Sequence, residues 1–335
     1  MNMRVAIAGA TGLVGRTMLE LLDERDFPLA SLRLLASTRS AGTEIVFRGE
    51  SIRVEELVAD SFVDCDIALF SAGGSTSRRF APTARDAGAV VIDNSSAWRM
   101  DPAVPLVVPE VNAATISADP GIIANPNCST IQLVVPLDAL SNRFGLERVV
   151  LSTYQAISGA GARAVEQLRD ETEGRANGSS PFRHPVAYNT TFHDFLDGAI
   201  ETEEEQKVER ETRKILGLAA LPITATCVRI PTIGAHGESV NVELSGEATR
   251  DDIIALLSDT PGVVVVDDPG ADRYPTVLES QGKDEIFVGR IRPDRSRPRC
   301  WNLWIVSDNL RKGAATNAIQ IAEKVVGLKS ARVDV

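Results

Sequence analysis

The sequence predicts an α/β protein with two domains, a Rossmann-like, doubly wound first domain and an α+β second domain on a mixed sheet. Three observations support this prediction. At 335 residues the chain is too long for one ordinary core and short for three. Short apolar segments alternate with helical patterns over the first part of the chain, which is typical of a parallel sheet. Longer strands with interspersed helices follow, which favours a mixed sheet.

The chain opens with a strand, a glycine loop and a helix. Residues 4–8 (RVAIA) are apolar, and residues 18–22 show a helical pattern. The loop between them has the spacing G-x-x-G-x-x-G rather than G-x-G-x-x-G, which is a weak signal alone. In this context its backbone is expected to approach a pyrophosphate at the helix N-terminus. The contact candidates in this loop are Gly9, Thr11, Gly12, Leu13 and Val14.

The second strand, residues 32–36, ends where an NAD-specific fold usually places an acid for the ribose hydroxyls. Residues 37–42 contain no acid. Ser37, Arg39 and Ser40 suit a 2′-phosphate instead, so we expect NADP rather than NAD. The alternative is that Arg39 is a solvated loop arginine.

Further strand and helix units complete the first domain. Strands are expected at 67–70 and 90–93, with a helix through residue 87 between them and a loop at 94–99. The loop after the first of these strands supplies the cofactor candidates Ser71 and Gly73. An amphipathic helix at 314–326 is expected to return to this domain. The expected domains are therefore residues 1–128 plus 310–335, which bind NADP, and residues 129–309, which carry catalysis and dimerisation.

The second domain combines long strands with helices. Strands are expected at 149–156, 225–230, 239–244, 262–266, 286–288 and 301–306, and helices at 162–173, 203–216 and 251–258.

Cys128 lies in the turn Asn-Pro-Asn-Cys-Ser-Thr, between an apolar strand and an apolar helical segment. Pro126 restricts the backbone, and Ser129 and Thr130 suit the first turn of a helix. At such a helix N-terminus the backbone N–H groups and the helix dipole favour a thiolate. The alternative is a small cysteine buried between apolar segments.

Other candidate site residues occur further along the chain. Gln155 ends a strand before a glycine-rich turn, in which Ser158 and Gly159 could approach a cofactor. Arg229 and His236 bracket a loop between two strands, and an arginine fork beside a histidine suits carboxylate binding and proton transfer. A plain strand-end glutamine and a hydrogen-bonded loop histidine are the alternatives.

Glu204 and Lys207 are three residues apart on one predicted helix. From spacing alone, a surface ion pair is the expected interpretation.

Composition limits the partners. A net charge of −11 and a pI of about 4.9 argue against binding to nucleic acid or to an anionic membrane surface. The N-terminus has no signal-peptide pattern and no segment is long enough to span a membrane, so a cytoplasmic protein is expected. No C-x-x-C spacing occurs among the four cysteines, which favours neither a disulfide scaffold nor a metal site.

These motifs resemble the aspartate-β-semialdehyde dehydrogenase family. The resemblance covers essentially the whole chain, in order, at residues 9–15, 37–42, 94–99, 125–130, 154–161, 204–207 with 211–216, 227–240 and 307–310. The turn around Cys128 and the Cys-Val-Arg-Ile-Pro to Gly-Ala-His-Gly-Glu-Ser-Val stretch are its most specific parts. Two departures are the missing proline in residues 189–193 and Gly237, where serine is common.

The resemblance implies an enzyme that works through a cysteine thioester. It makes Cys128 the nucleophile, His236 the general acid and base, and Gln155 a group that positions the substrate. It further implies that Arg229 binds the substrate carboxylate, that Glu204 binds its amino group, that Arg99, Asn127 and Lys207 lie at the phosphate, and that Asn309 is a cofactor contact. Lys207 would then not belong to a plain surface pair.

The implied reaction is the NADPH-dependent reductive dephosphorylation of L-4-aspartyl phosphate to L-aspartate 4-semialdehyde. It serves the synthesis of lysine, threonine, methionine and diaminopimelate, and the implied assembly is a homodimer. One alternative is N-acetyl-γ-glutamyl-phosphate reductase, although its cysteine turn usually has glycine where Asn127 stands. A catalytically silent nucleotide-binding homologue is the other.

Overall fold

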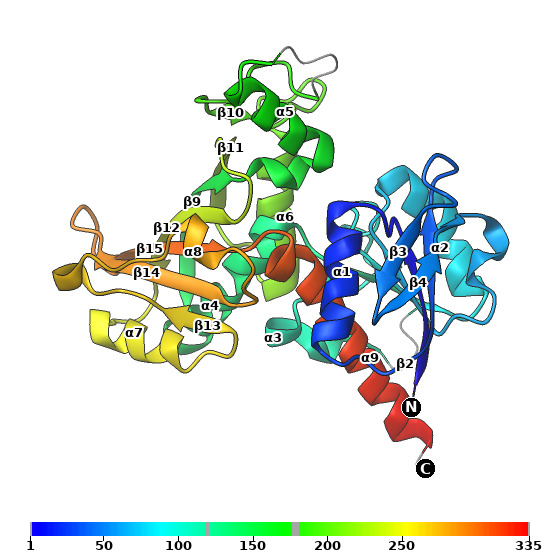
Figure 1. Ribbon diagram of the computed structural model, residues 1–335. Helices are drawn as coiled ribbons and strands as arrows, with labels where there is room; N and C mark the ends of the chain where they lie inside the picture. Colours follow the sequence, from blue (N-terminus) through cyan, green and yellow to red (C-terminus); the bar gives the residue numbers. More distant parts are fainter. Residues whose placement is uncertain (1, 118–120, 176–180, 334–335) are drawn as a thin grey trace. The chain divides into compact units, whose positions relative to one another are not determined.

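The chain divides into two compact units in a computed structural model that describes residues 2–117, 121–175 and 181–333 (Figure 1). The first unit is Met1–Pro126 with Ala314–Val335, and the second is Asn127–Gly313. The chain thus changes units near the two expected boundaries, but Cys128 falls in the second unit. The reason is local, because the helix that begins at Cys128 takes its cap, Asn127, with it.

A six-stranded parallel sheet in the order β5-β2-β1-β6-β7-β8 forms the centre of the first unit. Its strands are β1 (Met3–Ala8), β2 (Leu29–Ala36), β5 (Glu55–Glu56), β6 (Ile67–Phe70), β7 (Val90–Asp93) and β8 (Ile122–Ala124). The inner strands are apolar along nearly their whole length, as expected when both faces of a parallel sheet are covered. This confirms the doubly wound first domain.

The helices of this unit are α1 (Leu13–Glu24), α2 (Gly74–Asp86), α3 (Pro109–Asn112) and α9 (Asn317–Val333). Met18 and Leu22 of α1 share one buried cluster with Ile319 and Val325 of α9. The prediction that the C-terminal helix returns to the first domain is therefore confirmed. This helix runs further than expected and follows a π-helical turn, Arg311–Thr316.

One hairpin of the first unit, β3 (Glu44–Phe47) and β4 (Glu50–Arg53), was not predicted. Its turn residues Arg48 and Gly49 have φ values of 48° and 81°. Arginine is rare in this conformation, and the usual signal for such a turn is Asn-Gly. The Arg-Gly sequence therefore did not indicate a hairpin.

A seven-stranded mixed sheet in the order β10-β11-β9-β12-β15-β14-β13 forms the second unit. Its strands are β9 (Leu146–Gln155), β10 (Thr191–Phe192), β11 (Ile223–Arg229), β12 (His236–Leu244), β13 (Val263–Val265), β14 (Ile286–Pro293) and β15 (Cys300–Ser307). The helices are α4 (Cys128–Phe144), α5 (Ala162–Thr172), α6 (Glu203–Leu216), α7 (Arg250–Ser258) and α8 (Val277–Ser280). The expected mixed sheet is confirmed, and only the two-residue β10 and the single-turn α8 were missed.

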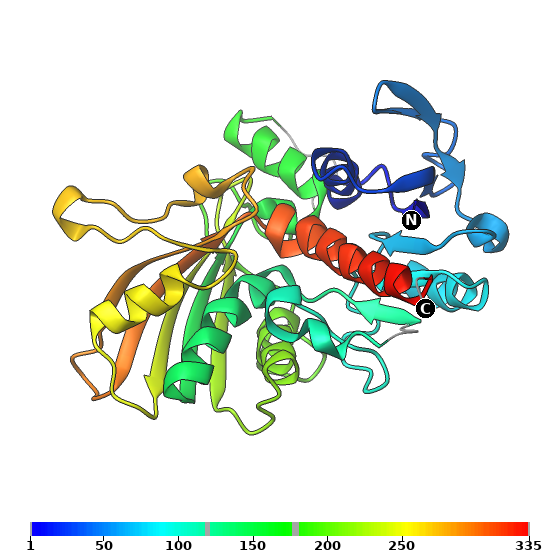
Figure 2. The same cartoon turned by 90° about the horizontal axis from the view of Figure 1, so that it is seen from below.

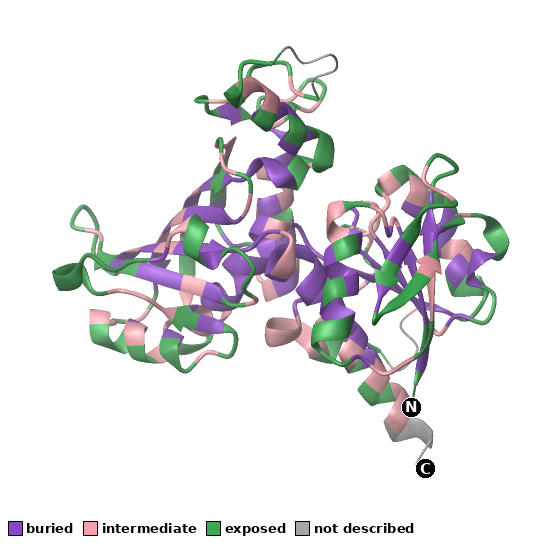
Figure 3. Cartoon of the chain, viewed as in Figure 1, coloured by how far each residue is buried: buried purple, intermediate pink, exposed green. Residues whose placement is uncertain are grey.

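Helices α4, α6 and α7 pack beside one another on one face of this sheet (Figure 2). Residues 129–137 of α4 are all buried, and α4 lies among the buried parts of the unit in Figure 3. The register places Arg229 opposite Gln155, and the Gly237–Tyr154 pair places His236 next to them. Three predicted site residues therefore meet at one end of the sheet.

Among the described residues, no helix is both long and apolar enough to cross a membrane.

Gly237 has a packing reason to lack a side chain. A Cβ atom there would lie 2.4 Å from the indole ring of Trp304, and the ring contacts the Tyr154 ring at a centroid distance of 5.6 Å. The indole occupies the space that a serine side chain would need.

We expect Gly237→Ala to lower the free energy of unfolding by about 1–3 kcal/mol, because the indole must move. Urea unfolding followed by circular dichroism measures the effect. Gly327→Ala is the control, since a Cβ there meets no atom within 4 Å, and we expect it to raise stability by roughly 0.5–1 kcal/mol. Equal midpoints for Gly237→Ala and the unaltered chain would contradict the packing argument.

Candidate active site

Cys128 is the first residue of α4, as the sequence predicts. Asn127 caps this helix, and its Oδ1 accepts hydrogen bonds from the backbone N–H groups of Ser129 at 2.9 Å and Thr130 at 3.4 Å. A Cβ added to Gly313 would lie 3.0 Å from the Cβ of Cys128, so the chain passes closely over the cysteine. The thiol is only partly buried and lies at the positive end of the helix dipole, which favours the thiolate.

The same asparagine connects α4 to α6. Its Nδ2 donates to Oε1 of Glu204 at 2.8 Å, and its backbone N–H donates to Oε2 of Glu211 at 2.7 Å. Two acidic residues of one helix therefore hold the residue that precedes Cys128.

Gln155 is the last residue of β9 and is buried. Its Nε2 lies 2.8 Å from Oγ of Ser129 and 3.2 Å from Oε1 of Glu204. A carboxylate can only accept, so the amide nitrogen must face Glu204. The amide is thereby oriented beneath the first turn of the cysteine helix.

His236 begins β12, directly after the loop that separates it from Arg229. The backbone N–H of Ala156 donates to its Nδ1 at 2.9 Å, so the neutral ring carries its proton on Nε2. This Nε2 is buried and has no hydrogen-bond partner among the described residues. Burial, with Arg229 nearby, lowers the pKa of His236 to about 3. The site holds a neutral imidazole whose Nε2–H is available to a substrate.

Arg229 ends β11 and lies close to His236. Its Nη1 donates to the Ala156 carbonyl at 3.3 Å, and its Nη2 lies 3.4 Å from Nδ1 of His193. A Cβ added to Gly159 would lie 3.2 Å from Nη1 of Arg229 and 3.5 Å from Nε2 of His236. Glycine at this position leaves both groups accessible.

Glu204 is buried in the first turn of α6, behind the cap Thr202. Burial acts to raise the pKa of its carboxyl, but His193, Lys207, the Asn127 amide and Arg229 together lower it to about 2. Burial lowers the pKa of His193 itself to about 4, so that ring is neutral at pH 7. The carboxylate therefore depends chiefly on Lys207, Asn127 and Arg229.

The surface-pair interpretation of Glu204 and Lys207 is wrong. Lys207 does lie 3.6 Å from Glu204 and 2.9 Å from Glu203. Glu204, however, is 7% exposed and contacts Asn127 and Gln155. These partners come from other segments of the chain, so spacing along one helix cannot reveal them.

Arg99 belongs to the first unit and is buried there. Its Nε donates to the Asn125 carbonyl and its Nη2 to the Asn94 carbonyl, both at 2.9 Å. These bonds fasten the 94–99 loop to the turn that leads to Cys128.

A hollow of about 720 Å³ opens beside the glycine loop of the first unit. The cofactor candidates that line it are Gly9, Thr11, Gly12, Ser37, Arg39, Ser40 and Ser71. Gly9 has φ of 90°, and a Cβ there would lie 2.3 Å from the Ser71 carbonyl oxygen. Arg39 and the backbone N–H groups at the start of α1 suit a phosphorylated dinucleotide.

The remaining cofactor candidates lie around this hollow or in the second unit. Leu13 and Val14 begin α1, and Gly73 caps α2. In the second unit the side chains of Ser158 and Asn309 are hydrogen-bonded at 3.0 Å, and Asn309 accepts the Ala235 N–H at 2.9 Å.

Four residues near these sites were not predicted from the sequence: Glu56, Arg79, His193 and Glu238. Glu56, on the edge strand β5, accepts a hydrogen bond from Thr38 at 2.5 Å and lines the cofactor hollow together with Arg79. His193 contacts Arg229, and Glu238 is buried on β12. Their neighbours come from other strands and helices, so the spacing of residues along the sequence does not indicate a site. Glu238 lies in the stretch around His236, and His193 ends the segment 189–193, but neither was assigned a role.

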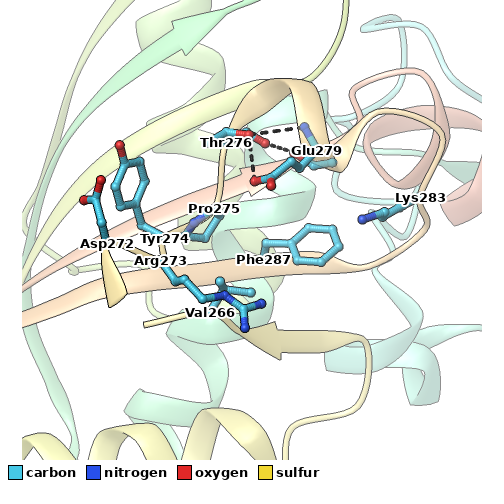
Figure 4. Close-up of a pocket in the computed structure, with 10 residues that line it drawn as sticks. Val266, Asp272, Arg273, Tyr274, Pro275, Thr276, Glu279, Lys283 and Phe287 are labelled. Carbon is cyan, nitrogen blue, oxygen red and sulfur yellow. Dashed lines mark hydrogen bonds between the residues drawn. The ribbon is translucent and has the colours of Figure 1, made fainter. Parts of the chain in front are cut away.

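A second, polar hollow of about 310 Å³ lies in the second unit beside α8 and includes Arg273, Glu279 and Lys283 (Figure 4). The residues that follow α8 contact the loop before His236 and the segment after β15. Gln281 donates to the Gly234 carbonyl at 3.2 Å, and the backbone N–H of Gly282 donates to Asp308 at 2.8 Å.

Burial of a neutral His236 predicts a pH-dependent stability. The unfolded chain protonates this histidine near its ordinary pKa of 6.5, and the folded chain does so only near 3. The unfolded state thus binds more protons between these values, and stability falls as pH decreases. From pH 7 to pH 5 we expect the unaltered chain to lose about 2 kcal/mol more than His236→Gln. Urea unfolding at both values measures this difference. His184→Gln, at an exposed histidine, is the control, and parallel pH profiles for His236→Gln and the unaltered chain would refute the assignment.

The chain is similar to known proteins over nearly its whole length. Residues 4–118 match the model of the semialdehyde dehydrogenase NAD binding domain, and residues 137–312 match the semialdehyde dehydrogenase dimerisation domain. The aspartate-semialdehyde dehydrogenase of Aquifex aeolicus is 50% identical over 337 residues, with 97% of this chain and 98% of the relative covered.

Two solved structures are also similar. Aspartate semialdehyde dehydrogenase II of Vibrio cholerae, complexed with ASA, superposes with a TM-score of 0.92 at 42% identity, covering 97% of this chain and 98% of that one. The Candida albicans enzyme with NADP has a TM-score of 0.77 at 25% identity, covering 98% and 99%. The chain therefore belongs to the aspartate-semialdehyde dehydrogenase family.

Proposed function

We propose that Cys128 is the nucleophile of an NADP-dependent phosphorylating aldehyde dehydrogenase, which converts L-4-aspartyl phosphate to L-aspartate 4-semialdehyde and inorganic phosphate. One observation carries the proposal: Cys128 starts a capped helix in the unit that also groups Gln155, Arg229 and His236. Membership of the family supports this reaction over N-acetyl-γ-glutamyl phosphate reduction. The aldehyde supplies lysine, threonine, methionine and diaminopimelate synthesis.

Substrate binding follows from charge. Arg229 offers a guanidinium fork to the α-carboxylate, and the ionised Glu204 attracts the amino group. We assign Arg99, Asn127 and Lys207 to the phosphate. Asn127 and Lys207 both contact the Glu204 carboxylate, and Arg99 donates to the carbonyl of Asn125 in the turn before Asn127.

The covalent step uses the Cys128 thiolate. Its Sγ forms a bond to the acyl carbon, the bond from that carbon to the phosphate oxygen breaks, and phosphate leaves with the electron pair. The thioester that remains accepts hydride more readily than a carboxylate would. Arg39 and the glycine loop at Gly9 and Gly12 would hold NADPH, which would supply the hydride that turns the thioester carbonyl into an oxyanion.

His236 then acts as a donor rather than as a base. Its Nδ1 lone pair is engaged by Ala156, so Nε2–H can donate to the oxyanion. Collapse of the oxyanion breaks the C–S bond and returns the Cys128 thiolate, which requires no proton transfer. A neutral imidazole with a low pKa is therefore sufficient for the reductive direction.

We also propose a homodimer formed through the second unit, as the dimerisation-domain match supports. The sheet face opposite α4 bears an apolar hollow of about 490 Å³ that includes Tyr154, Leu303 and Trp304. The cytoplasm is the proposed location, since a reducing compartment keeps a reactive thiol reduced.

A spectrophotometric assay with aspartate semialdehyde, NADP and phosphate tests this function. We expect NADPH formation to depend on phosphate, and Cys128→Ala to abolish it. Iodoacetamide should inactivate the enzyme by modifying Cys128, and phosphate should slow the modification. Cys65→Ala, at a buried cysteine of the first unit, is the control and should remain sensitive. Inactivation with Cys128 unmodified in the mass spectrum would place the nucleophile elsewhere.

Cofactor preference should respond in opposite directions to two charges in the hollow. Arg39→Ala removes a contact to the 2′-phosphate and should lower the ratio of kcat/KM for NADP over NAD by roughly thirtyfold, about 2 kcal/mol. Glu56→Gln removes a negative charge and should raise the same ratio. Steady-state kinetics with both cofactors gives the ratios. An unchanged ratio in Arg39→Ala would exclude Arg39 from the 2′-phosphate site.

A further inference from the structure

Glu238 has no part in the steps above, although it lies beside them. It is the third residue of β12, so its side chain points to the same sheet face as that of His236, two residues earlier. Its side chain is fully buried, with 0% exposure, and its backbone pairs with Thr153 of β9. A carboxyl group thus lies under the catalytic helix α4.

This carboxyl lacks the partners that a charge would need. Neither oxygen has a hydrogen-bond partner among the described residues, and no described ion pair includes it. Burial raises the pKa of Glu238 well above its usual range, and only the Gln132 and Ser129 side chains act to lower it. A buried carboxyl without a cation takes the neutral form.

Ser129 needs a hydrogen-bond acceptor and Gln132 needs a donor, and a neutral carboxylic acid provides both. Gln155 donates to Oγ of Ser129 at 2.8 Å, so the Ser129 hydroxyl must give its own hydrogen to another acceptor. Gln132 directs Nε2 to the His236 carbonyl at 3.4 Å, which leaves its buried Oε1 without a donor. A carboxylic acid offers one acceptor and one donor, whereas a carboxylate only accepts.

We propose that Glu238 is a positioning residue that accepts the Ser129 hydroxyl and donates its own proton to Oε1 of Gln132. Through Ser129 it orients the Gln155 amide, and through Gln132 it supports the backbone at His236. The inference rests on the proposed function, because it gives Gln155 a task in the reaction.

Three variants separate this role from plain packing. Glu238→Gln keeps an acceptor and a donor in nearly the same shape, and should retain kcat within about threefold. Glu238→Leu fills the space without either group, and should lower kcat about tenfold with little change in the KM for phosphate. Ser129→Ala should lower kcat similarly. The double variant Ser129→Ala/Glu238→Leu should be no slower than the slower single variant, because both changes break one chain of bonds.

Two further readouts test the protonation state and the integrity of the site. The infrared difference spectrum between the unaltered enzyme and Glu238→Gln at pH 7 should contain the C=O stretch of a protonated carboxylic acid. The rate at which iodoacetamide modifies Cys128 should be unchanged in Glu238→Leu, since the Asn127 cap remains.

Several outcomes would overturn the inference. Loss of activity in Glu238→Gln equal to that in Glu238→Leu would mean that the ionisable group itself is needed. Full activity in Glu238→Leu would leave no positioning role, and multiplicative effects in the double variant would remove the link through Ser129. If Glu238→Leu does not fold, Glu238→Met, which also lacks both groups, takes its place in the single and the double variant.

Gln155→Ala distinguishes the two levels of failure. If it lowers kcat while the Glu238 variants do not, only the positioning role fails. If it leaves kcat unchanged, the assignment of Gln155 in the proposed function fails as well.

Discussion

The side chain of Asn127 is the contact on which the second unit's catalytic end depends. Its oxygen accepts a backbone hydrogen bond at the N-terminus of α4, and its nitrogen donates to the carboxylate of Glu204 on α6. One amide therefore fixes where Cys128 lies along its helix and ties that helix to the residue assigned to the substrate amino group. Glycine has no side chain and could make neither of these bonds. A turn with glycine before the cysteine, as in N-acetyl-γ-glutamyl-phosphate reductase, would therefore lack this connection.

The surroundings of two buried carboxyl groups, Glu204 and Glu238, give them different protonation states. Glu204 stays ionised because Lys207, Arg229 and the Asn127 amide lower the pKa of its carboxyl, whereas burial raises the pKa of Glu238 and no cation acts to lower it. Gln155 contacts Glu204 directly, and it also contacts Ser129, through which we propose a link to Glu238. Two buried carboxyl groups in one layer thus take opposite protonation states, each set by its own environment.

The sequence predicted the parts of this site that are local. The turn 125–130 contains its own strand end, proline and cap, so Cys128 could be placed at a helix start without knowledge of the fold. Arg229 and His236 were placed by the loop between them. Glu204 and Glu56 depend on strands and helices distant in sequence, and both were misjudged or missed for that reason. Packing from another segment decides burial, and burial decides whether a carboxylate is a surface ion or a binding group.

Alternation along β12 separates two functions on one strand. His236 and Glu238 face α4, whereas Gly237 between them faces Trp304 on the other side of the sheet. Serine is common in the family at this position. The packing of the Trp304 indole, and not contact with the substrate, therefore accounts for Gly237. A change that looks catalytic in the sequence, because it adjoins His236, belongs to the face proposed for the dimer. Substitutions on one face of β12 can occur without changing the other face, because only every second side chain of a strand points to a given face.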